Sequence, residues 1–449
     1  MAFSRRDFLK RTCCTAAAGM AAASFSRLGF INAMAQSTPD YKALVCIFMF
    51  GGNDANNLLI PFDATGYKNY AAIRGGLALP QNQVLPIQPA SSATPFAFHP
   101  RFVEMQNLFN SKQLAVLANV GTLVQPTTRQ QLMQGQAPLP ENLFSHSDQQ
   151  AQMQTGDPST LGASGWGGRL ADKVQSIYGG SFPIAISLAG TNVFVEGLSG
   201  RSIESNGSPT QPLSGFNGSS ADAGRLAAVQ SLLTFDTGLS LIQKASAVTS
   251  NAFLDSKLLA DALAANPAFT TQFPNSGLGR QLLQVAQIIQ ARASLGLARQ
   301  IFFVSTGGFD THSAQLPQQD GLLRDLSQSM NAFFNATVEM NLAQNVTTFT
   351  LSDFSRTLQP DSTSGSDHAW GSHHLIMGGA AKGGDLYGTF PTLALGGPDD
   401  ATNQGRWIPT TSLDQYGATL AQWFGVPAAD LPSVFPTLAN FTTPTLNFI

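Results

Sequence analysis

Acidic and imidazole side chains follow three apolar stretches of this chain, at the positions where a parallel sheet would gather them. These side chains are Asp54, Asp310, His312, Asp353, Asp367 and His368. Mixed carboxylate and imidazole donors suit zinc, manganese or iron, whereas calcium and magnesium favour oxygen donors alone. The pattern therefore predicts a site for divalent metal ions, with enough ligands for two ions that would hold both oxygens of an in-line displacement at phosphorus.

Histidine is scarce, which makes its distribution informative. Only six His occur in 449 residues, and four of them belong to the segments that follow the apolar stretches: His312, His368, His373 and His374. Adjacent side chains cannot easily bind one ion together, so at least one of His373 and His374 is expected to pack in the core or to support a ligand. We take His373 as the metal-binding candidate of the two.

Each of these residues also has a purely structural interpretation. The sequence Gly-Gly-Asn-Asp at 51–54 is typical of a tight turn in which Asp54 caps a helix. Asp310 is equally suited to a helix N-cap, and Asp353 to an ion pair with Arg356. The coincidence of acids and imidazoles after three predicted strands favours the metal site over these separate explanations.

Ser145 is the candidate nucleophile. It lies in the segment 142–148, Asn-Leu-Phe-Ser-His-Ser-Asp, just ahead of a helix-like stretch. The N–H groups at a helix N-terminus can hold an oxyanion or phosphate, and a neighbouring metal would lower the pKa of the hydroxyl. The alternative is that Ser145 or Ser147 simply caps the helix. A Ser/His/Asp hydrolase is disfavoured because no G-x-S-x-G elbow occurs.

These side chains need a sheet whose strands end level with one another. Short apolar stretches bounded by turn residues predict buried strands at 42–50, 113–120, 182–188, 300–305 and 346–351. Helix-like stretches between them cover 101–110, 148–155, 167–178, 222–265, 279–298 and 316–340. Strands that are apolar throughout, alternating with helices, indicate an α/β fold with a mostly parallel sheet covered on both faces. Ligands bind beyond the carboxyl ends of such strands.

The first 35 residues are typical of an export signal. Residues 4–10 read Ser-Arg-Arg-Asp-Phe-Leu-Lys, an uncharged run of small residues covers 12–26, and Ala-Met-Ala at 33–35 predicts cleavage before Gln36. This pattern resembles a twin-arginine signal, which implies the twin-arginine translocase as a partner and a periplasmic or secreted protein exported already folded. The apolar run is too short and weak for a membrane span of about 20 residues, so no stable membrane insertion is expected.

The remaining residues, 36–449, are predicted to form one α/β domain with a loop and helical excursion at about 197–298. The 31 Phe and 43% hydrophobic residues exclude disorder, although only 11% of residues are charged. The signal carries five basic and one acidic residue, so the net charge after cleavage is −7 rather than −3, and Cys46 is the single Cys left. Such a chain has no basic field for nucleic acid and no disulfide framework.

Seven motifs occur in an order that resembles a known family. They are FMFGGNDANN, NLFSHSDQQAQMQTG with GWGGRLAD, STGGFDTH, TLSDFSRT, GSDHAWGSHHLIMGGA and SLDQYGATLAQWFGV. With the signal they resemble, over nearly the whole chain, the exported bacterial proteins grouped as domain of unknown function 1501 (DUF1501). That family is considered a relative of the alkaline phosphatase and sulfatase superfamily, which implies an alkaline-phosphatase-like α/β hydrolase core with two metal ions.

The resemblance also implies roles for individual residues. Asp54 matches the ligand after the first strand, and Asp310 with His312 matches an acid–imidazole pair after a later strand. The superfamily has an Asp-His pair directly after a strand, a role open here to Asp353 or to the pair 367–368. The remaining imidazole ligand would come from the pair 373–374. A formylglycine sulfatase is disfavoured because C/S-x-P-x-R is absent.

Two functions from different classes follow. The first is an exported metal-dependent hydrolase of phosphate, phosphonate or sulfate esters, of small molecules or polymers, in which Ser145 or a water attacks and Arg356 steadies the anion. The alternative is a non-catalytic envelope or secretion factor that retains the hydrolase fold, with or without one structural metal. Metal content and ester turnover discriminate between the two.

Overall fold

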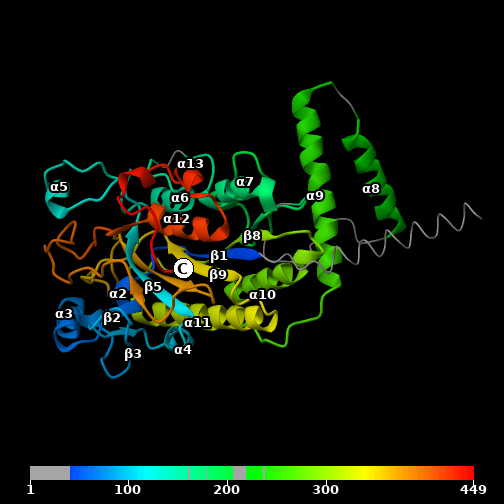
Figure 1. The fold of residues 1–449 in the computed structure, drawn as a ribbon. Coiled ribbons are helices and arrows are strands. Elements are labelled where there is room, and N and C mark those ends of the chain that lie inside the picture. The colour runs from blue at the N-terminus through cyan, green and yellow to red at the C-terminus, as the bar shows by residue number, and fades with distance from the viewer. Residues whose placement is uncertain (1–40, 160–161, 179, 206–218, 236–237) are drawn as a thin grey trace, which may run out of the picture. The chain divides into compact units, whose positions relative to one another are not determined.

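The core of the protein is a mostly parallel sheet of nine strands (Figure 1). The structure is a computed structural model and describes residues 41–159, 162–178, 180–205, 219–235 and 238–449. The predicted signal at 1–35 lies outside these residues. The strands are β1 (Lys42–Met49), β5 (Leu114–Gly121), β6 (Ala185–Ser187), β7 (Ser202–Glu204), β8 (Arg299–Thr306), β9 (Val346–Ser352), β10 (Ser372–Met377), β11 (Leu386–Tyr387) and β12 (Thr411–Ser412). Their order is β11-β5-β10-β9-β1-β8-β6-β7, with β12 beside β5.

The carboxyl ends of the three central strands are level with one another. β1 pairs in parallel with β8 on one side and β9 on the other, and Met49 is the partner of both Thr306 and Ser352. The residues that follow these strands therefore leave the sheet at one edge. This register explains how residues about 300 positions apart in sequence come into contact, as Gly51 and Asp353 do.

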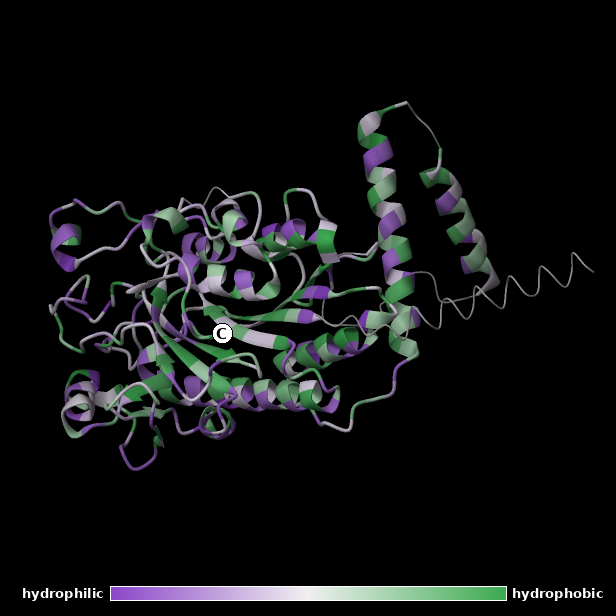
Figure 2. Ribbon diagram, viewed as in Figure 1, coloured by the Kyte–Doolittle hydropathy of each residue, from purple (hydrophilic) through white to green (hydrophobic). Residues whose placement is uncertain are grey.

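Burial on both faces accounts for the apolar strands. Every residue from Ala43 to Met49 is fully buried, and the central strands are hydrophobic along most of their length (Figure 2). A strand covered on both faces carries an apolar run rather than an alternating pattern. A separate antiparallel sheet contains β2 (Leu59–Pro61), β3 (Leu85–Ile87) and β4 (Phe96–Phe98) in the order β2-β4-β3.

Helices cover both faces of the central sheet, with α4, α10 and α11 on one face and α6, α7 and α12 on the other (Figure 1). The helices are α2 (Ala55–Leu58), α3 (Ala64–Arg74), α4 (Val103–Asn110), α5 (Arg129–Met133), α6 (His146–Thr155), α7 (Trp166–Tyr178), α8 (Ser220–Leu233), α9 (Ser240–Ala264), α10 (Gly277–Gln290), α11 (Gln315–Glu339), α12 (Leu413–Phe424) and α13 (Leu431–Val434). The predicted mostly parallel α/β sheet is confirmed. None of the helices in the described part of the chain has the length and hydropathy needed to cross a bilayer.

The predicted excursion at 197–298 needs several corrections. The helix-like stretch expected over 222–265 is helical, and it forms two helices, α8 and α9, which pack side by side (Figure 1). The helix expected over 279–298 ends as α10 at Gln290, followed by a 3-10 turn and by Gly296 with φ of 67°. Residues 202–204 are not a surface loop but β7, which pairs in parallel with β6. Residues 206–218 lie outside the described part.

Strand β10 was not predicted, and it changes the position of two histidines. It runs antiparallel between β9 and β5, and both His373 and His374 are fully buried within it. Burial lowers the pKa of each imidazole to about 3, so both are neutral at physiological pH. Two consecutive His interrupt the apolar run that identifies the other central strands, which is why the pattern did not predict this one.

Asp414 makes stability depend on pH. It lies buried in the first turn of α12, and its Oδ2 accepts hydrogen bonds from the backbone N–H and the hydroxyl of Thr437. Burial raises the pKa of Asp414 to about 7, so the folded state binds more protons than the unfolded state between about pH 4 and pH 7. The free energy of unfolding should therefore fall as pH rises through this window.

We predict that Asp414→Asn is more stable than the wild type by about 2–4 kcal/mol at pH 8, with a much smaller difference at pH 4. Urea unfolding at a series of pH values measures this difference. Asp430→Asn, which changes a half-exposed carboxyl group next to α13, should run parallel to the wild type. A difference between Asp414→Asn and the wild type that does not change with pH would contradict the prediction.

Candidate metal centre

Three imidazoles meet at the carboxylate of Asp310. Its Oδ1 lies 3.0 Å from Nε2 of His312 and 3.3 Å from Nε2 of both His146 and His368. Nε2 of His368 lies 3.1 Å from Nε2 of His146 and 2.9 Å from Nε2 of His312. Ligands at about 2.0–2.1 Å from a tetrahedral zinc ion are about 3.3 Å apart. These five distances match the spacing of zinc ligands, and the ligand atoms of His146, Asp310 and His368 all lie within 4.8 Å of one another. We call these three residues, together with His312, the metal cluster.

The four members of the cluster come from two loops and one helix start. Asp310 and His312 lie between β8 and α11, and His146 is the first residue of α6, which packs against the end of β9. His368 follows β9 and forms an isolated antiparallel bridge with Arg356. The level ends of the central strands bring the Asp310 loop and the His368 loop together, and α6 supplies the third imidazole from above β9.

The opposite nitrogens of two imidazoles face acceptors. Nδ1 of His146 lies 2.6 Å from Oδ2 of Asp353, and Nδ1 of His368 lies 2.7 Å from the backbone oxygen of Phe144. A neutral imidazole that donates from Nδ1 presents a lone pair at Nε2, as metal-binding histidines do. Lone pairs 3.1 Å apart repel each other unless a cation lies between them. One proton would satisfy a single contact, whereas a metal ion would satisfy all of them.

The turn before α6 is strained in a way that serves this arrangement. Phe144 has φ of 73°, which bulky residues rarely adopt, and its carbonyl oxygen is the acceptor for His368. Such backbone costs about 1–3 kcal/mol and concentrates at functional sites. The amide of Phe144 is in turn held by Oε1 of Gln149 at 2.6 Å.

Asp353 orients His146 instead of reaching the centre of the cluster. Its Oδ1 accepts the backbone N–H of Gly51 at 3.1 Å, and its Oδ2 accepts Nε2–H of Gln150 at 2.7 Å besides facing His146. The hydrogen bond to Asp353 raises the pKa of His146 and outweighs burial, which lowers this pKa. The structure thus places this predicted ligand one layer behind the metal cluster.

Arg356 holds Asp310 in place. Its side chain is fully buried, and Nη1 donates to Oδ1 of Asp310 at 2.7 Å and to the oxygen of Gly51 at 3.2 Å. Nε and Nη2 donate to the hydroxyl and the backbone oxygen of Ser366. Desolvation raises the pKa of Asp310, but the hydrogen bond and charge of Arg356 outweigh it and lower this pKa to about 2. Asp310 is therefore ionised, and the nitrogens of Arg356 are committed to protein groups.

Asp54 does not join the cluster. It is buried, and its Oδ2 accepts hydrogen bonds from Arg74 and Gln315, while its Oδ1 caps α2 by accepting the N–H of Asn56 at 3.1 Å. Burial raises the pKa of Asp54, against the charges of Arg74 and Arg356, which lower it. The environment matches the capping interpretation of the sequence, with an added buried ion pair.

The remaining predicted residues lie at the margin of the cluster or outside it. His373 is buried in β10, where its Nδ1 accepts the N–H of Asn119 at 3.0 Å. Ser145 occupies the N-cap position of α6, and its hydroxyl donates to Asp148. Asp367 is half-exposed, with Oδ1 3.7 Å from Nδ1 of His312.

A second group of donors shares one residue with the metal cluster. His312, Asp361 and Asp367 offer ligand atoms within 4.8 Å of one another. Oδ1 of Asp361 already accepts the backbone N–H groups of Thr363 and Gly365, which shape the loop. The four-residue cluster is therefore the better-defined metal centre of the two.

His146 is the member that the sequence pattern missed as a ligand. It stands next to Ser145 in the motif that was examined for a nucleophile, but it begins a helix rather than following a strand. The signal that could have identified it is its neighbourhood: it is one of six His, and a carboxamide lies one turn further along at Gln150. Gln150 donates to the same carboxylate that orients His146.

Gly51 lies where the loop after β1 packs against the loop after β8, and a substitution there tests how closely the two loops fit. Its φ is 113°, and a Cβ there would lie 2.4 Å from the backbone nitrogen of Asp310 and 2.9 Å from the carbonyl carbon of Phe309. We predict that Gly51→Ala displaces Asp310 and weakens metal binding by about 10–100-fold, the loss typical of disturbed support around a ligand. Metal titration measures the effect.

Gly307→Ala is the matched control, because this residue lies in the same loop with no atom within 4 Å of the added Cβ. Its metal affinity should equal that of the wild type. Equal affinities in both variants and the wild type would contradict the proposed fit between the loops.

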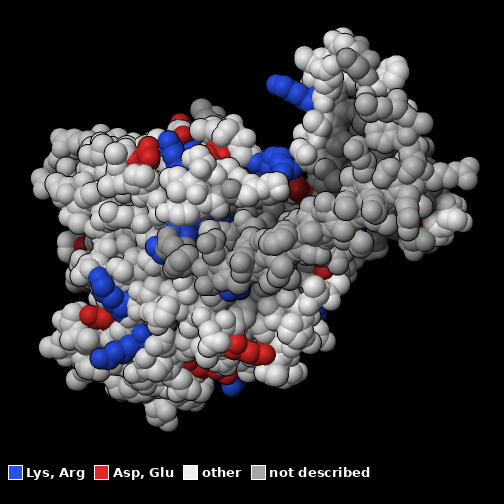
Figure 3. Space-filling model, turned by 45° about the vertical axis from the view of Figure 1, so that its right-hand side comes forward, with Lys and Arg blue, Asp and Glu red and all other residues white. Residues whose placement is uncertain are grey.

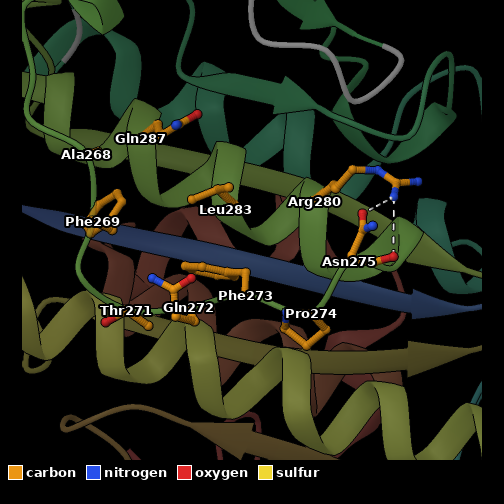
Figure 4. A pocket seen from close by; sticks show the side chains of 10 residues that line it. All are labelled: Ala268, Phe269, Thr271, Gln272, Phe273, Pro274, Asn275, Arg280, Leu283 and Gln287. Atoms are coloured by element: carbon orange, nitrogen blue, oxygen red, sulfur yellow. Dashed lines mark hydrogen bonds between the residues drawn. The ribbon is translucent and has the colours of Figure 1, made fainter.

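Two other hollows in the described part of the chain are lined by no imidazole. The pocket in Figure 4, of about 310 Å³, lies between residues 268–275 and α10 and is lined by no carboxylate or imidazole. Its Arg280 donates to the side chain of Asn275 at 3.0 Å (Figure 4). A larger pocket of about 560 Å³ lies between β7 and α9, where Arg201 is paired with Asp255. Uncharged residues predominate on the face drawn in Figure 3, in keeping with the 11% charged content.

Comparisons with known proteins identify a family but no activity. The profile of the family described as "Protein of unknown function (DUF1501)" matches residues 41–408. A search of curated proteins finds no match. Among solved structures, Ps i-CgsB in complex with k-i-k-neocarrahexaose is similar with a TM-score of 0.37 and 9% identity, over 89% of this chain and 77% of that chain. The PsFucS1 sulfatase from Pseudoalteromonas sp. is similar with a TM-score of 0.35 and 10% identity, over 93% and 72%. Similarities of this size carry no inference about activity.

Proposed function

The chain belongs to the DUF1501 family of proteins of unknown function, and from that premise and the geometry of the metal cluster we propose that it is a metal-dependent hydrolase of phosphate, phosphonate or sulfate esters. The proposal includes export by the twin-arginine route to the periplasm or the exterior, which rests on residues 4–10 of the sequence. A family match alone names neither a substrate nor a metal, so both must come from the chemistry of the site.

One observation carries the proposal: three Nε2 atoms converge on one ionised carboxylate oxygen, with distances of 2.9–3.3 Å between the close pairs. Imidazole and carboxylate donors at these spacings fit zinc best and accept manganese or iron. The residues that would hold the ion are His146, Asp310, His312 and His368. When bound, such an ion supplies a Lewis acid for an ester oxygen and lowers the pKa of a water.

The surrounding side chains supply orientation and access. Asp353 and the carbonyl of Phe144 fix the tautomers of two ligands, and Arg356 keeps Asp310 ionised. The side chains of Asp310 and His312 are 47% and 45% exposed, so a substrate can reach the cluster from solvent. We propose water rather than Ser145 as the nucleophile, because the hydroxyl of Ser145 donates to Asp148 and its other hydrogen-bond partner is the hydroxyl of Ser147 at 3.0 Å.

A second candidate function is supported by the number of donors. Structural zinc sites use four protein ligands, the number that the metal cluster offers, whereas catalytic sites commonly keep one position for water. A non-catalytic envelope or secretion factor with one structural metal would use the same four residues. The exposure of Asp310 and His312 favours the hydrolase, since structural sites have no need of solvent access.

An activity assay on metal-loaded protein, prepared with its signal intact so that export selects folded chains, separates the candidates. We expect turnover of an aryl phosphate, phosphonate or sulfate by the wild type and its loss in His368→Ala. Stoichiometric metal without turnover of any ester would favour the structural candidate. A wild type that binds no metal would reject the hydrolase and the structural metal, and would leave a non-catalytic factor without metal.

A further inference from the structure

We propose that Arg406 binds the anionic group of the substrate at the metal cluster, so that the substrate class is a tetrahedral oxyanion ester. This inference rests on the proposed function and names a specificity-determining residue for it. Arg406 lies in the segment between β11 and β12, remote in sequence from every member of the cluster. No pattern in the sequence singled it out.

The guanidinium of Arg406 is fixed against the residues that support His368. Its Nε donates to the backbone oxygen of His368 at 2.6 Å. Its guanidinium carbon lies 4.8 Å from the ring centroid of Phe144, whose carbonyl accepts from Nδ1 of the same histidine. Two independent contacts thus place the guanidinium beside the backbone of His368, and a planar guanidinium stacked on a ring is held in one orientation.

The charge of Arg406 has no full partner in the described part of the chain. No carboxylate there forms an ion pair with it, although Asp367 and Asp400 act on it electrostatically. Nη1 reaches the hydroxyl of Thr402 only at 3.5 Å, and Nη2 makes no hydrogen bond to any described residue. A half-buried guanidinium with free N–H groups is suited to an anion, which it can bind through two parallel hydrogen bonds.

The other arginines around the site are already committed. Arg356 is fully buried and donates to Asp310, Gly51 and Ser366. Arg74 is fully buried against Asp54 and backbone oxygens. The role of steadying the anion, assigned to Arg356 from the sequence, therefore passes to Arg406.

The chemistry of this placement selects the ligand. A metal ion held by the cluster, together with a guanidinium anchored on the backbone of one of its ligands, would match an ester that presents several equivalent anionic oxygens, as phosphate and sulfate esters do. A neutral carboxylic ester offers one carbonyl oxygen and would leave the guanidinium unpaired. The pairing thus distinguishes oxyanion esters from carboxylic esters as substrates.

Inorganic phosphate and inorganic sulfate are the probes for the test, with binding measured by calorimetry on the zinc-loaded full chain. We expect Arg406→Gln to weaken phosphate or sulfate binding by about 10–100-fold while zinc content stays at the wild-type value. The anion affinity of Arg406→Lys should lie between those of the wild type and Arg406→Gln, because lysine keeps the charge but lacks the planar fork. In turnover assays of Arg406→Gln, the factor by which KM rises should exceed the factor by which kcat falls.

Arg324→Gln is the control, since this exposed arginine pairs with Asp320 on α11 and should leave phosphate binding unchanged. Unchanged affinity for both anions in zinc-loaded Arg406→Gln overturns the inference while leaving the proposed function standing. A wild type that holds zinc but binds neither anion also overturns it. If Arg406→Gln fails to hold zinc, the anion affinity of zinc-loaded Arg406→Lys is compared with that of the wild type instead, and an unchanged affinity overturns the inference. Absence of zinc, manganese and iron alike from the wild type overturns the proposed function itself.

Discussion

The His146→Ala variant is expected to bind zinc at least about 100-fold more weakly than the wild type while remaining folded. His146 supplies one of the three Nε2 atoms at the cluster, and its side chain is 28% exposed, so its removal leaves no large cavity. Losing an orienting partner alone typically costs 10–100-fold in metal affinity, and losing a ligand costs more. Elemental analysis and competition with a zinc chelator measure the change.

Matched variants separate ligation from general damage. His99→Ala removes a buried histidine outside the cluster, whose Nδ1 accepts the N–H of Arg101, and should lower stability without changing zinc affinity. Asp353→Asn should weaken zinc binding by about 10–100-fold, because the amide orients His146 less well than the carboxylate does. Wild-type zinc affinity in His146→Ala would show that the convergence of imidazoles does not bind metal.

The second large effect is expected at Arg74. Arg74→Ala should lower the free energy of unfolding by about 3–5 kcal/mol, because it leaves Asp54 buried without its ion pair. Arg74 also donates to the backbone oxygens of Thr357 and Leu358, which lose these hydrogen bonds. Burial already raises the pKa of Asp54, so the carboxyl would fold in its protonated form at a cost that grows as pH rises.

Urea unfolding measures this loss, and two further variants interpret it. Arg101→Ala breaks a partly exposed ion pair with Asp320 and should cost less than about 1 kcal/mol. Adding Asp54→Asn to Arg74→Ala should recover part of the stability, since no charge remains to bury. A loss below about 1 kcal/mol in Arg74→Ala would contradict the role given to the pair. Zinc binding by Asp54→Asn equal to that of the wild type would confirm that Asp54 is not a ligand.

The fold was largely predictable because burial leaves a direct mark on the sequence. Strands β1 and β8 are covered on both faces and carry apolar runs, and β9 alternates buried threonines with Val346, Phe349 and Leu351. The predicted bounds of all three match the observed ones within a residue or two. The strand expected at 182–188 is shorter, because Pro183 has no N–H to give the sheet and β6 begins only at Ala185.

The site was predictable only where its residues follow strands. Asp310 and His312 were found because they come directly after an apolar run, and His368 because histidine is rare. His146 begins a helix, and its role depends on how α6 packs over β9, which no local pattern encodes.

Partners distant in sequence explain the residues whose positions differ from expectation. Asp54 meets Arg74 and Gln315, Asp353 meets His146, and Arg406 meets His368, all through tertiary packing. A carboxylate after a strand can therefore be a ligand, an orienting group or half of a buried ion pair. Sequence patterns identify the candidates, and the partner decides the role.

Zinc-edge X-ray absorption of the wild-type protein tests the central claim most directly. We predict a first shell that contains three imidazole nitrogens and one carboxylate oxygen at about 2.0–2.2 Å, with the imidazole scattering reduced by one ligand in His146→Ala. A shell of oxygens alone, or one that is identical in the wild type and His146→Ala, would contradict a metal centre built from His146, Asp310, His312 and His368.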